Sequence, residues 1–190
     1  MNLAAEEHPI PAVLPFIHPL DEFYTNAGLT LPRIEVVAGA LVPEPFNQLL
    51  VHDGDMTPAL ESFHDCTLKL EVLRREQRNG FYFREVVLLS EDEANRVEFG
   101  AIKIFLHLFP SGARNDILAE RLPLGTVLAK YKIPHTSRPK AFLKIRSDAF
   151  INKALHLEGQ HTLFGRRNTI STRDDHVLAE IVEILPPASS

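Results

Sequence analysis

Apolar and polar residues alternate with a period of two over long stretches of this chain, which is the pattern of half-buried β-strands. Residues 68–72 alternate leucine and valine with lysine and glutamate. The Asn79-Gly80 pair, typical of a two-residue hairpin turn, leads into a second strand at 81–89 that is apolar on both faces. Further strands are predicted at 97–109, 157–172 and 176–185, the last two joined by a tight turn at 174–175.

Other segments carry helix signals. A first helix is predicted to begin near Pro45. Thr57 and Pro58 suit the N-cap and the first helical residue of a second helix, which would run to about His64. Residues 111–128 are typical of a helix with a break at 123–125, and we interpret the ambiguous segment 140–155 as helical.

Runs of neighbouring strands with short connections favour an antiparallel sheet with the helices segregated on one side, which is the α+β class. The 190 residues suit a single domain, which we assign to residues 45–190. Residues 1–44 contain prolines at positions 9, 11, 15 and 19, and we expect an irregular segment that lies across the surface.

Composition narrows the class of protein. With 45% hydrophobic and 24% charged residues the chain is typical of a globular protein, and its net charge of −5 argues against a nucleic-acid partner. Cys66 is the only cysteine, so no intrachain disulfide is possible. The chain begins without the basic stretch of a signal peptide, and no apolar run approaches the ~20 residues that span a membrane. We expect a cytoplasmic protein with no membrane partner, and the sequence leaves its oligomeric state open.

Arg84 has the strand parity of Tyr82, Val86 and Leu88, so it faces a largely apolar side of the predicted sheet. Burying an unpaired guanidinium is costly, so Arg84 needs a carboxylate from the protein or from a ligand. The planar fork of arginine suits a two-point contact with a carboxylate. A structural ion pair with a neighbouring strand is the alternative.

The last strand carries two glutamates, Glu180 and Glu183, on opposite faces that are otherwise apolar. One of the two carboxylates therefore lies among hydrophobic neighbours, and strand parity does not decide which. A pair between Arg84 and Glu180 would satisfy both residues without any function. Arg166 and Arg167 also point in opposite directions, so at most one of them faces a ligand.

Metal and cofactor signals were sought among the nine histidines and the single cysteine. The chain has no His-x-x-x-His or Cys-x-x-Cys spacing and no glycine-rich phosphate loop. We therefore predict that the protein uses neither a metal ion nor a cofactor.

Five short motifs occur in the order and spacing of a known family. They are Leu-Leu-Val-His-Asp-Gly-Asp-Met-Thr at 49–57, Arg84-Glu85-Val86, Pro123-Leu124-Gly125, Leu163-Phe164-Gly165-Arg166-Arg167 and Leu178-Ala179-Glu180-Ile181. Over residues 45–186 the chain thus resembles the chorismate lyases, which eliminate pyruvate from chorismate to give 4-hydroxybenzoate.

The resemblance implies an antiparallel sheet with a small-molecule ligand enclosed under helical flaps. Arg84 would grip a ligand carboxylate, and Met56 and Leu124 would close the pocket. Glu180 would approach the hydroxyl end of the product, because Ala-Glu-Ile matches the family's Thr-Glu-Leu and so favours Glu180 over Glu183. Arg84 and Glu180 are therefore the candidate catalytic residues, Glu180 in an assisting role.

One departure bears on the substrate. Family members have Gly-Arg where this chain has Gly100-Ala101, and that arginine helps to neutralise the dianionic substrate. Lys103 has the parity of Ala101 and is one possible replacement. Arg166 is the other, so both are candidate substrate-binding residues.

The same fold also serves as the effector-binding domain of GntR-type regulators, where it only senses ligands. No recognisable helix-turn-helix precedes the domain here, which counts against a complete repressor. We expect a lyase that acts on chorismate or a close relative. The alternatives are a non-catalytic protein that binds a small aromatic carboxylate, and a structural α+β domain whose arginine and glutamate side chains pair.

Overall fold

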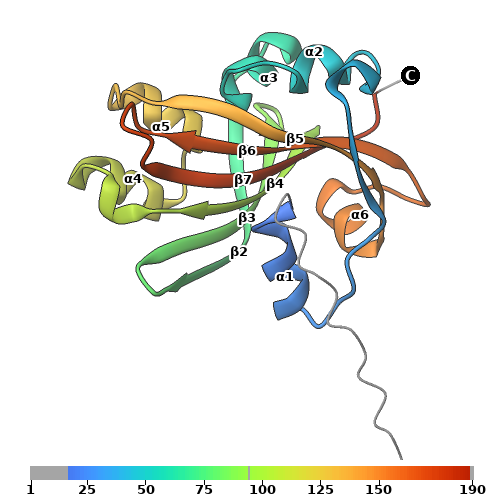
Figure 1. Ribbon diagram of the computed structural model, residues 1–190, viewed down its shortest axis with the longest axis horizontal. Helices are drawn as coiled ribbons and strands as arrows, with labels where there is room; N and C mark the ends of the chain where they lie inside the picture. Colours follow the sequence, from blue (N-terminus) through green and yellow to red (C-terminus); the bar gives the residue numbers. More distant parts are fainter. Residues whose placement is uncertain (1–16, 94, 189–190) are drawn as a thin grey trace, which may run out of the picture.

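Seven strands of the described chain form one antiparallel sheet (Figure 1). The computed structural model describes residues 17–93 and 95–188. The strands are β1 (Ile34–Val37), β2 (Leu68–Arg78), β3 (Phe81–Ser90), β4 (Arg96–Ile104), β5 (Thr136–Arg146), β6 (Thr162–Ser171) and β7 (Val177–Leu185). Their order across the sheet is β1-β5-β6-β7-β4-β3-β2, and each neighbouring pair is antiparallel. The predicted α+β class with an antiparallel sheet is confirmed.

Helices cover both faces of this sheet, whereas the sequence led us to expect one (Figure 1). Helices α1 (Leu20–Asn26) and α6 (Ala149–Leu155) pack on one side, here called the α1 face. On the other side, the cavity face, lie α2 (Phe46–Leu50), α3 (Met56–His64), α4 (Ser111–Ala119) and α5 (Leu124–Lys130). The one-sided expectation is wrong because the central strands are apolar on both faces, and each face needs cover.

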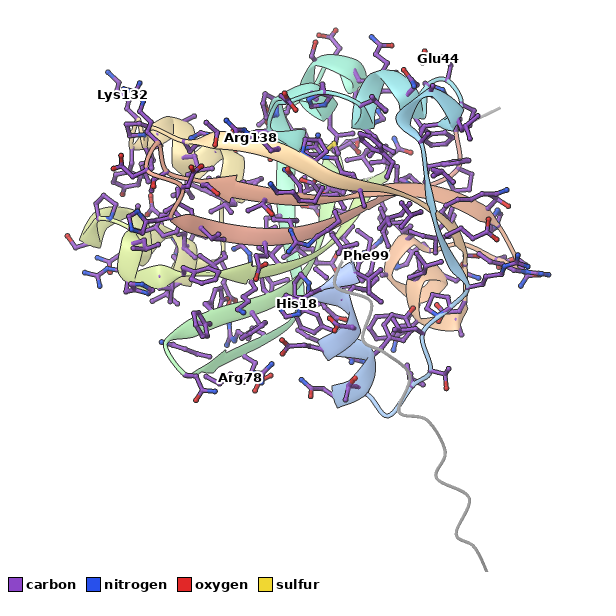
Figure 2. The ribbon with its side chains drawn as sticks, in the orientation of Figure 1. His18, Glu44, Arg78, Phe99, Lys132 and Arg138 are labelled. Carbon is purple, nitrogen blue, oxygen red and sulfur yellow. The ribbon has the colours of Figure 1, made fainter. Side chains whose placement is uncertain are left out.

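Each face of the sheet buries its own hydrophobic core. Alternate residues of the central strands contribute to the two cores. The α1 face buries the aromatic and aliphatic residues Phe23, Tyr24, Phe83, Val87, Phe99, Leu143, Ile151 and Val182. Figure 2 marks Phe99 near α1 and α6. The cavity face buries a second set against α4 and α5, namely Val86, Ile102, Ile104, Ile117, Leu124, Val127 and Ile181, while Met56 and Leu60 of α3 pack on β2 and β3.

Several local predictions are confirmed. Asn79 and Gly80 adopt positive φ angles of 51° and 79°, as the hairpin between β2 and β3 requires. The helical region after residue 111 breaks at Pro123 into α4 and α5. Helix α3 ends at His64 as expected but begins at Met56, with Asp55 in the N-cap position that we had given to Thr57.

The segment 140–155 is helical only in its second half. Strand β5 continues to Arg146 and buries Leu143 and Ile145 in the core of the α1 face. Asp148 then caps α6, because its Oδ1 accepts a hydrogen bond of 3.0 Å from the backbone N–H of Ile151. The helical interpretation of residues 140–146 is wrong because sheet pairing with β6 decided the conformation of a short apolar stretch.

The N-terminal segment differs from the expected irregular stretch at 1–44. Prolines 9, 11 and 15 lie outside the described residues, but Pro19 directly precedes α1. Helix α1 buries Leu20, Phe23 and Tyr24, so it covers the sheet rather than lying loosely on the surface. Strand β1 pairs with β5 at the edge of the sheet. The described part of this segment is therefore integral to the fold.

Candidate functional site

A cavity of about 30 Å³ lies on the cavity face, between the sheet and the first residues of α3 and α5. We call it the Arg84 cavity. Its wall is largely apolar, with Leu70, Val86, Leu88, Ile102, Ile170 and Ile181 from the sheet and Met56 and Leu124 from the helices. The polar residues on its wall include Asp55, Arg84, Glu98, Asn168 and Glu183. A space of this size holds water, so an aromatic ligand requires α3 and α5 to move apart.

Arg84 lies on β3 with its side chain on the cavity face, and it is 0% exposed. Within residues 17–93 and 95–188, neither Nε nor either Nη atom of Arg84 has a hydrogen-bond partner. Burial lowers the pKa of Arg84 to about 10, against the opposing influence of nearby Tyr82 and Glu120. Arg84 is therefore still a cation at neutral pH, and it lacks the carboxylate that a buried guanidinium requires.

Arg166 is also 0% exposed, but its donors are occupied. Its Nε donates to Glu183 Oε2 at 2.5 Å, and its Nη1 donates to the carbonyl oxygens of Leu50 and His52 at 3.3 and 3.2 Å. Its Nη2 donates to the carbonyl oxygen of Gly54 at 2.9 Å. Arg166 thus ties β6 and β7 to the segment that leads into α3, which is the structural ion pair that we had considered for Arg84.

Besides Asp55, the sheet contributes two carboxyl groups to the cavity wall, Glu98 on β4 and Glu183 on β7, and each is 4% exposed. Glu183 is paired with Arg166, whereas Oε2 of Glu98 has no hydrogen-bond partner within the described chain. Burial and the neighbouring charge of Glu183 raise the pKa of Glu98 well above its usual range, and Arg166 only partly opposes this rise. These surroundings favour the protonated form of Glu98, which can donate a hydrogen bond as well as accept one.

The starts of α3 and α5, here called the flaps, lie over the cavity and are joined by polar contacts. His135, which follows α5, places its Nε2 2.8 Å from Oδ2 of Asp55, the N-cap residue of α3. Gly125, in the first turn of α5, lies against Thr57, since a Cβ at Gly125 would come within 2.9 Å of the Thr57 hydroxyl. The glycine of the Pro-Leu-Gly motif thus allows α5 to approach α3 closely.

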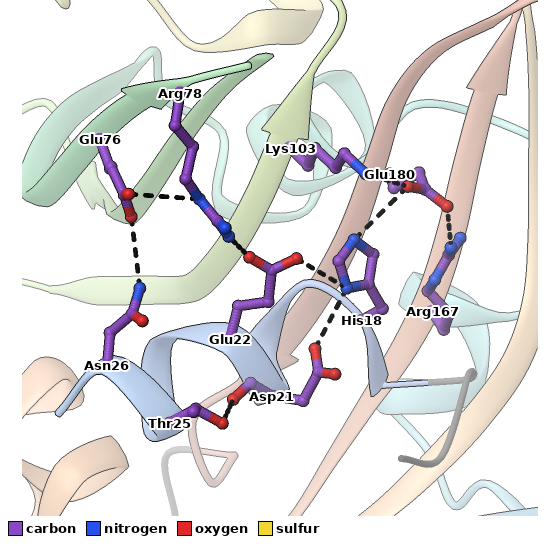
Figure 3. Close-up of polar contacts among 10 residues, drawn as sticks. All are labelled: His18, Asp21, Glu22, Thr25, Asn26, Glu76, Arg78, Lys103, Arg167 and Glu180. Carbon is purple, nitrogen blue, oxygen red and sulfur yellow. Dashed lines mark hydrogen bonds and ion pairs between the residues drawn. The ribbon is translucent and has the colours of Figure 1, made fainter. Parts of the chain in front are cut away.

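Glu180 and Lys103 lie on the α1 face, away from Arg84 (Figure 3). Glu180 receives a 2.6 Å hydrogen bond from Nη2 of Arg167, and its Oε2 lies 3.6 Å from both Lys103 Nζ and His18 Nε2. Glu180 and Lys103 are not on the wall of the Arg84 cavity, and a contact of either residue with a ligand stays a prediction. β4 and β7 are in a register that turns Glu183, rather than Glu180, toward the cavity.

The charge cluster around Glu180 anchors α1 to the sheet. His18 Nδ1 lies 3.2 Å from Asp21 and 3.4 Å from Glu22, and Glu22 also pairs with Arg78 of β2 (Figure 3). These contacts join the start of α1 to Glu180 on β7 and to Arg78 on β2. The ion pairs around Glu180 therefore hold α1 on the sheet, and this structural role accounts for the charged side chains gathered there.

Of the site residues expected from the sequence, Met56, Arg84 and Leu124 meet at the cavity, and Arg166 lies behind it. Sequence reasoning missed Asp55, Glu98 and Asn168. A signal for Glu98 was present, because it has the strand parity of Gly100, Ile102 and Ile104 on an apolar face.

Within the described residues, no group of three or more His, Cys, Asp or Glu side chains is placed to hold a metal ion. None of the helices in that part of the chain is both long and apolar enough to cross a bilayer.

The fold is that of the effector domains of GntR-type transcription regulators. The chain is similar to the effector domain of PhnF from Mycobacterium smegmatis, with 12% identity, coverage of 70% of this chain and 88% of that one, and a TM-score of 0.53. It is also similar to a PhnF structure from the same organism (10% identity, 87% and 92% coverage, TM-score 0.54). A third similar structure is gene product SA0254 from Staphylococcus aureus subsp. aureus N315 (10% identity, 63% and 82% coverage, TM-score 0.51). No family model and no curated protein matches the chain. At these identities the likeness shows the fold alone.

Proposed function

We propose that this protein binds a small aromatic or cyclohexadienyl carboxylate in the Arg84 cavity. The observation that carries the proposal is the fully buried guanidinium of Arg84, whose three nitrogen atoms have no partner within residues 17–93 and 95–188. A ligand carboxylate that forms two parallel hydrogen bonds would satisfy it. Because the site is removed from water, such a pair is stronger than the same pair at a surface.

The remainder of the wall favours a flat apolar body on the ligand. Val86, Ile102, Leu124 and Ile181 surround the cavity with aliphatic groups, and aromatic ligands pack well against such surfaces. The flaps formed by α3 and α5 would open to admit the ligand and then close over it. Such closure excludes water and slows release.

The test is calorimetric titration with 4-hydroxybenzoate. Arg84→Met should weaken binding by about 30-fold or more, since the loss of one partner of a buried charge pair costs about 2–5 kcal/mol. Arg138→Met is the matched control, because Arg138 is an exposed arginine of β5 (Figure 2) and its loss changes the net charge equally. If the affinity of the Arg84 variant is unchanged, Arg84 does not bind the ligand carboxylate and the proposal is wrong.

A second candidate function is elimination of pyruvate from chorismate. It is favoured because motif residues far apart in the sequence, Met56, Arg84, Leu124 and Ile181, all line one cavity. In that reaction the bond between the ring carbon and the enolpyruvyl oxygen breaks and the adjacent ring carbon loses its proton, which makes the ring aromatic. Glu98 and Glu183 are the carboxyl groups placed to assist these proton movements, in place of Glu180.

The charge of the cavity separates the two candidates. Chorismate has two carboxylates, and Arg84 is the one cation on the cavity wall within the described residues. This favours binding of a monocarboxylate over turnover of a dianion. Pyruvate release from chorismate, measured with the wild type and with Arg84→Met, distinguishes them: release that depends on Arg84 establishes the lyase, and its absence together with tight 4-hydroxybenzoate binding leaves the binding protein.

A further inference from the structure

Glu98 is a second buried side chain of the cavity that has an unsatisfied polar atom. It projects from β4 beside Gly100, and its Oε2 has no hydrogen-bond partner in the described residues. Leaving a buried carboxyl oxygen unpaired destabilises the fold. The position of this oxygen on the cavity wall indicates a partner from the ligand.

The surroundings of Glu98 decide its charge. The cation nearest in this network, Arg166, already donates to Glu183 at 2.5 Å and to three carbonyl oxygens. A negative charge on Glu98 would therefore stand beside the negative charge of Glu183 without a cation of its own. Burial acts in the same direction and raises the pKa of Glu98 well above its usual range. The cavity therefore combines a cation, Arg84, with a carboxyl group, Glu98, whose surroundings favour its uncharged form.

The two groups contact different parts of a ligand. Arg84 pairs with Ile102 across β3 and β4, and Glu98 lies four residues before Ile102 on β4. At 3.3 Å per residue, the two positions are roughly 13 Å apart along the strands. Val86, which pairs with Gly100, lies between them and contributes an apolar floor. The two side chains therefore enter the cavity from backbone positions that are well separated along the strands, so a ligand that contacts both needs two separate polar groups.

We propose that Glu98 sets the class of ligand: the site takes a monocarboxylate whose far end carries a neutral hydrogen-bonding group, such as a hydroxyl, and discriminates against dicarboxylates. This inference rests on the proposed carboxylate binding by Arg84. A second carboxylate would place a negative charge beside Glu183 with no free cation among the described residues of the cavity wall. A cationic amine is the rival far-end group, since it would hold Glu98 in its ionised form.

Para-substituted benzoates test the inference because they share one shape and differ in charge. Affinities of benzoate, 4-hydroxybenzoate, terephthalate and 4-(aminomethyl)benzoate are measured by calorimetry at pH 7. For the wild type we expect 4-hydroxybenzoate to bind at least tenfold more tightly than each of the other three. Terephthalate or 4-(aminomethyl)benzoate as the tightest ligand would overturn the assignment of a neutral Glu98.

Two substitutions at Glu98 separate its role from that of Arg84. Glu98→Leu should bring the affinity for 4-hydroxybenzoate to within threefold of the affinity for benzoate in the same variant. Glu98→Gln, which keeps the shape and both hydrogen-bonding functions of a neutral carboxyl group, should retain the preference to within threefold. If the preference for 4-hydroxybenzoate survives Glu98→Leu, or is lost in Glu98→Gln, Glu98 does not select the ligand although Arg84 still binds it. If no benzoate binds the wild type, the proposed function itself fails, and the role of Glu98 with it.

Discussion

Arg84 and Arg166 are both fully buried, yet only Arg166 has protein partners. The two should therefore respond oppositely to substitution by methionine. Arg84→Met removes an unpaired buried charge, and we expect it to raise the free energy of unfolding of the ligand-free protein by about 1–3 kcal/mol. Arg166→Met leaves Glu183 unpaired and should lower the free energy of unfolding by about 3–5 kcal/mol. Urea unfolding measures the free energy of unfolding of both variants. If both variants lose the same stability, Arg84 has a structural role like that of Arg166.

Glu85 is a buried carboxyl group of β3 on the α1 face, opposite the cavity. Burial raises its pKa from 4.5 to about 7, while Arg74, whose Nε lies 3.4 Å away, partly opposes the shift. The folded state therefore binds the proton more tightly than the unfolded state. Stability from this group is present below pH 4.5 and is lost as the pH rises toward 7, by a total on the order of 3 kcal/mol.

Glu85→Gln should remove this loss of stability. We expect the variant to have a flatter unfolding free energy than the wild type between pH 4.5 and 7, and to be the more stable of the two at pH 8. Other carboxyl groups titrate in both proteins, so the difference between them is the relevant quantity. Parallel pH profiles would show that Glu85 ionises in the folded protein as freely as in water.

At the scale of elements, the first residues of α3 and α5 lie over the Arg84 cavity, so the proposed binding requires these two helices to move apart. The contact of 2.8 Å between His135 Nε2 and Asp55 Oδ2 joins them, and Nδ1 of the same ring lies 2.7 Å from the carbonyl oxygen of Ile133. We call the contact between His135 and Asp55 the latch. His135→Ala should raise the association and dissociation rates of 4-hydroxybenzoate about 3- to 10-fold. The change in Kd should be smaller, because His135 is not on the cavity wall. Stopped-flow binding measures both rates. His176→Ala, at the exposed turn before β7, is the control, and equal rates in the two variants would exclude a latch.

At the scale of the whole molecule, a ligand that binds only the folded state stabilises all of it. At a hundredfold excess over its dissociation constant, 4-hydroxybenzoate should add about 2.7 kcal/mol to the free energy of unfolding. For a domain of this length the melting temperature should then rise by roughly 5–10 °C. Thermal unfolding with and without ligand measures the shift. A shift that persists in Arg84→Met would locate the binding site elsewhere.

Most of the secondary structure could be predicted from the sequence, because local pattern and turn chemistry act over a few residues. The Asn79-Gly80 hairpin, the alternation in β2 and the break before α5 are of this kind. Arg84 could be predicted as a site residue for the same reason, since one charge on an apolar strand face is visible without any partner strand. The irregular N-terminal segment was predicted from its prolines, but its role in covering the sheet was not visible there.

The tertiary structure alone decided which glutamate shares the cavity with Arg84. Both faces of β7 are apolar, so the direction of Glu180 and Glu183 depends on the register with β4 and on which helices cover each face. Whether Arg84 has an ion-pair partner was likewise decided by the tertiary structure, because the possible partners are distant in sequence. Glu183 pairs with Arg166 instead. Sequence determined the elements and the unusual residues because those are local properties. Packing determined which residues meet, because contacts between distant strands are fixed only when both faces of the sheet are buried together.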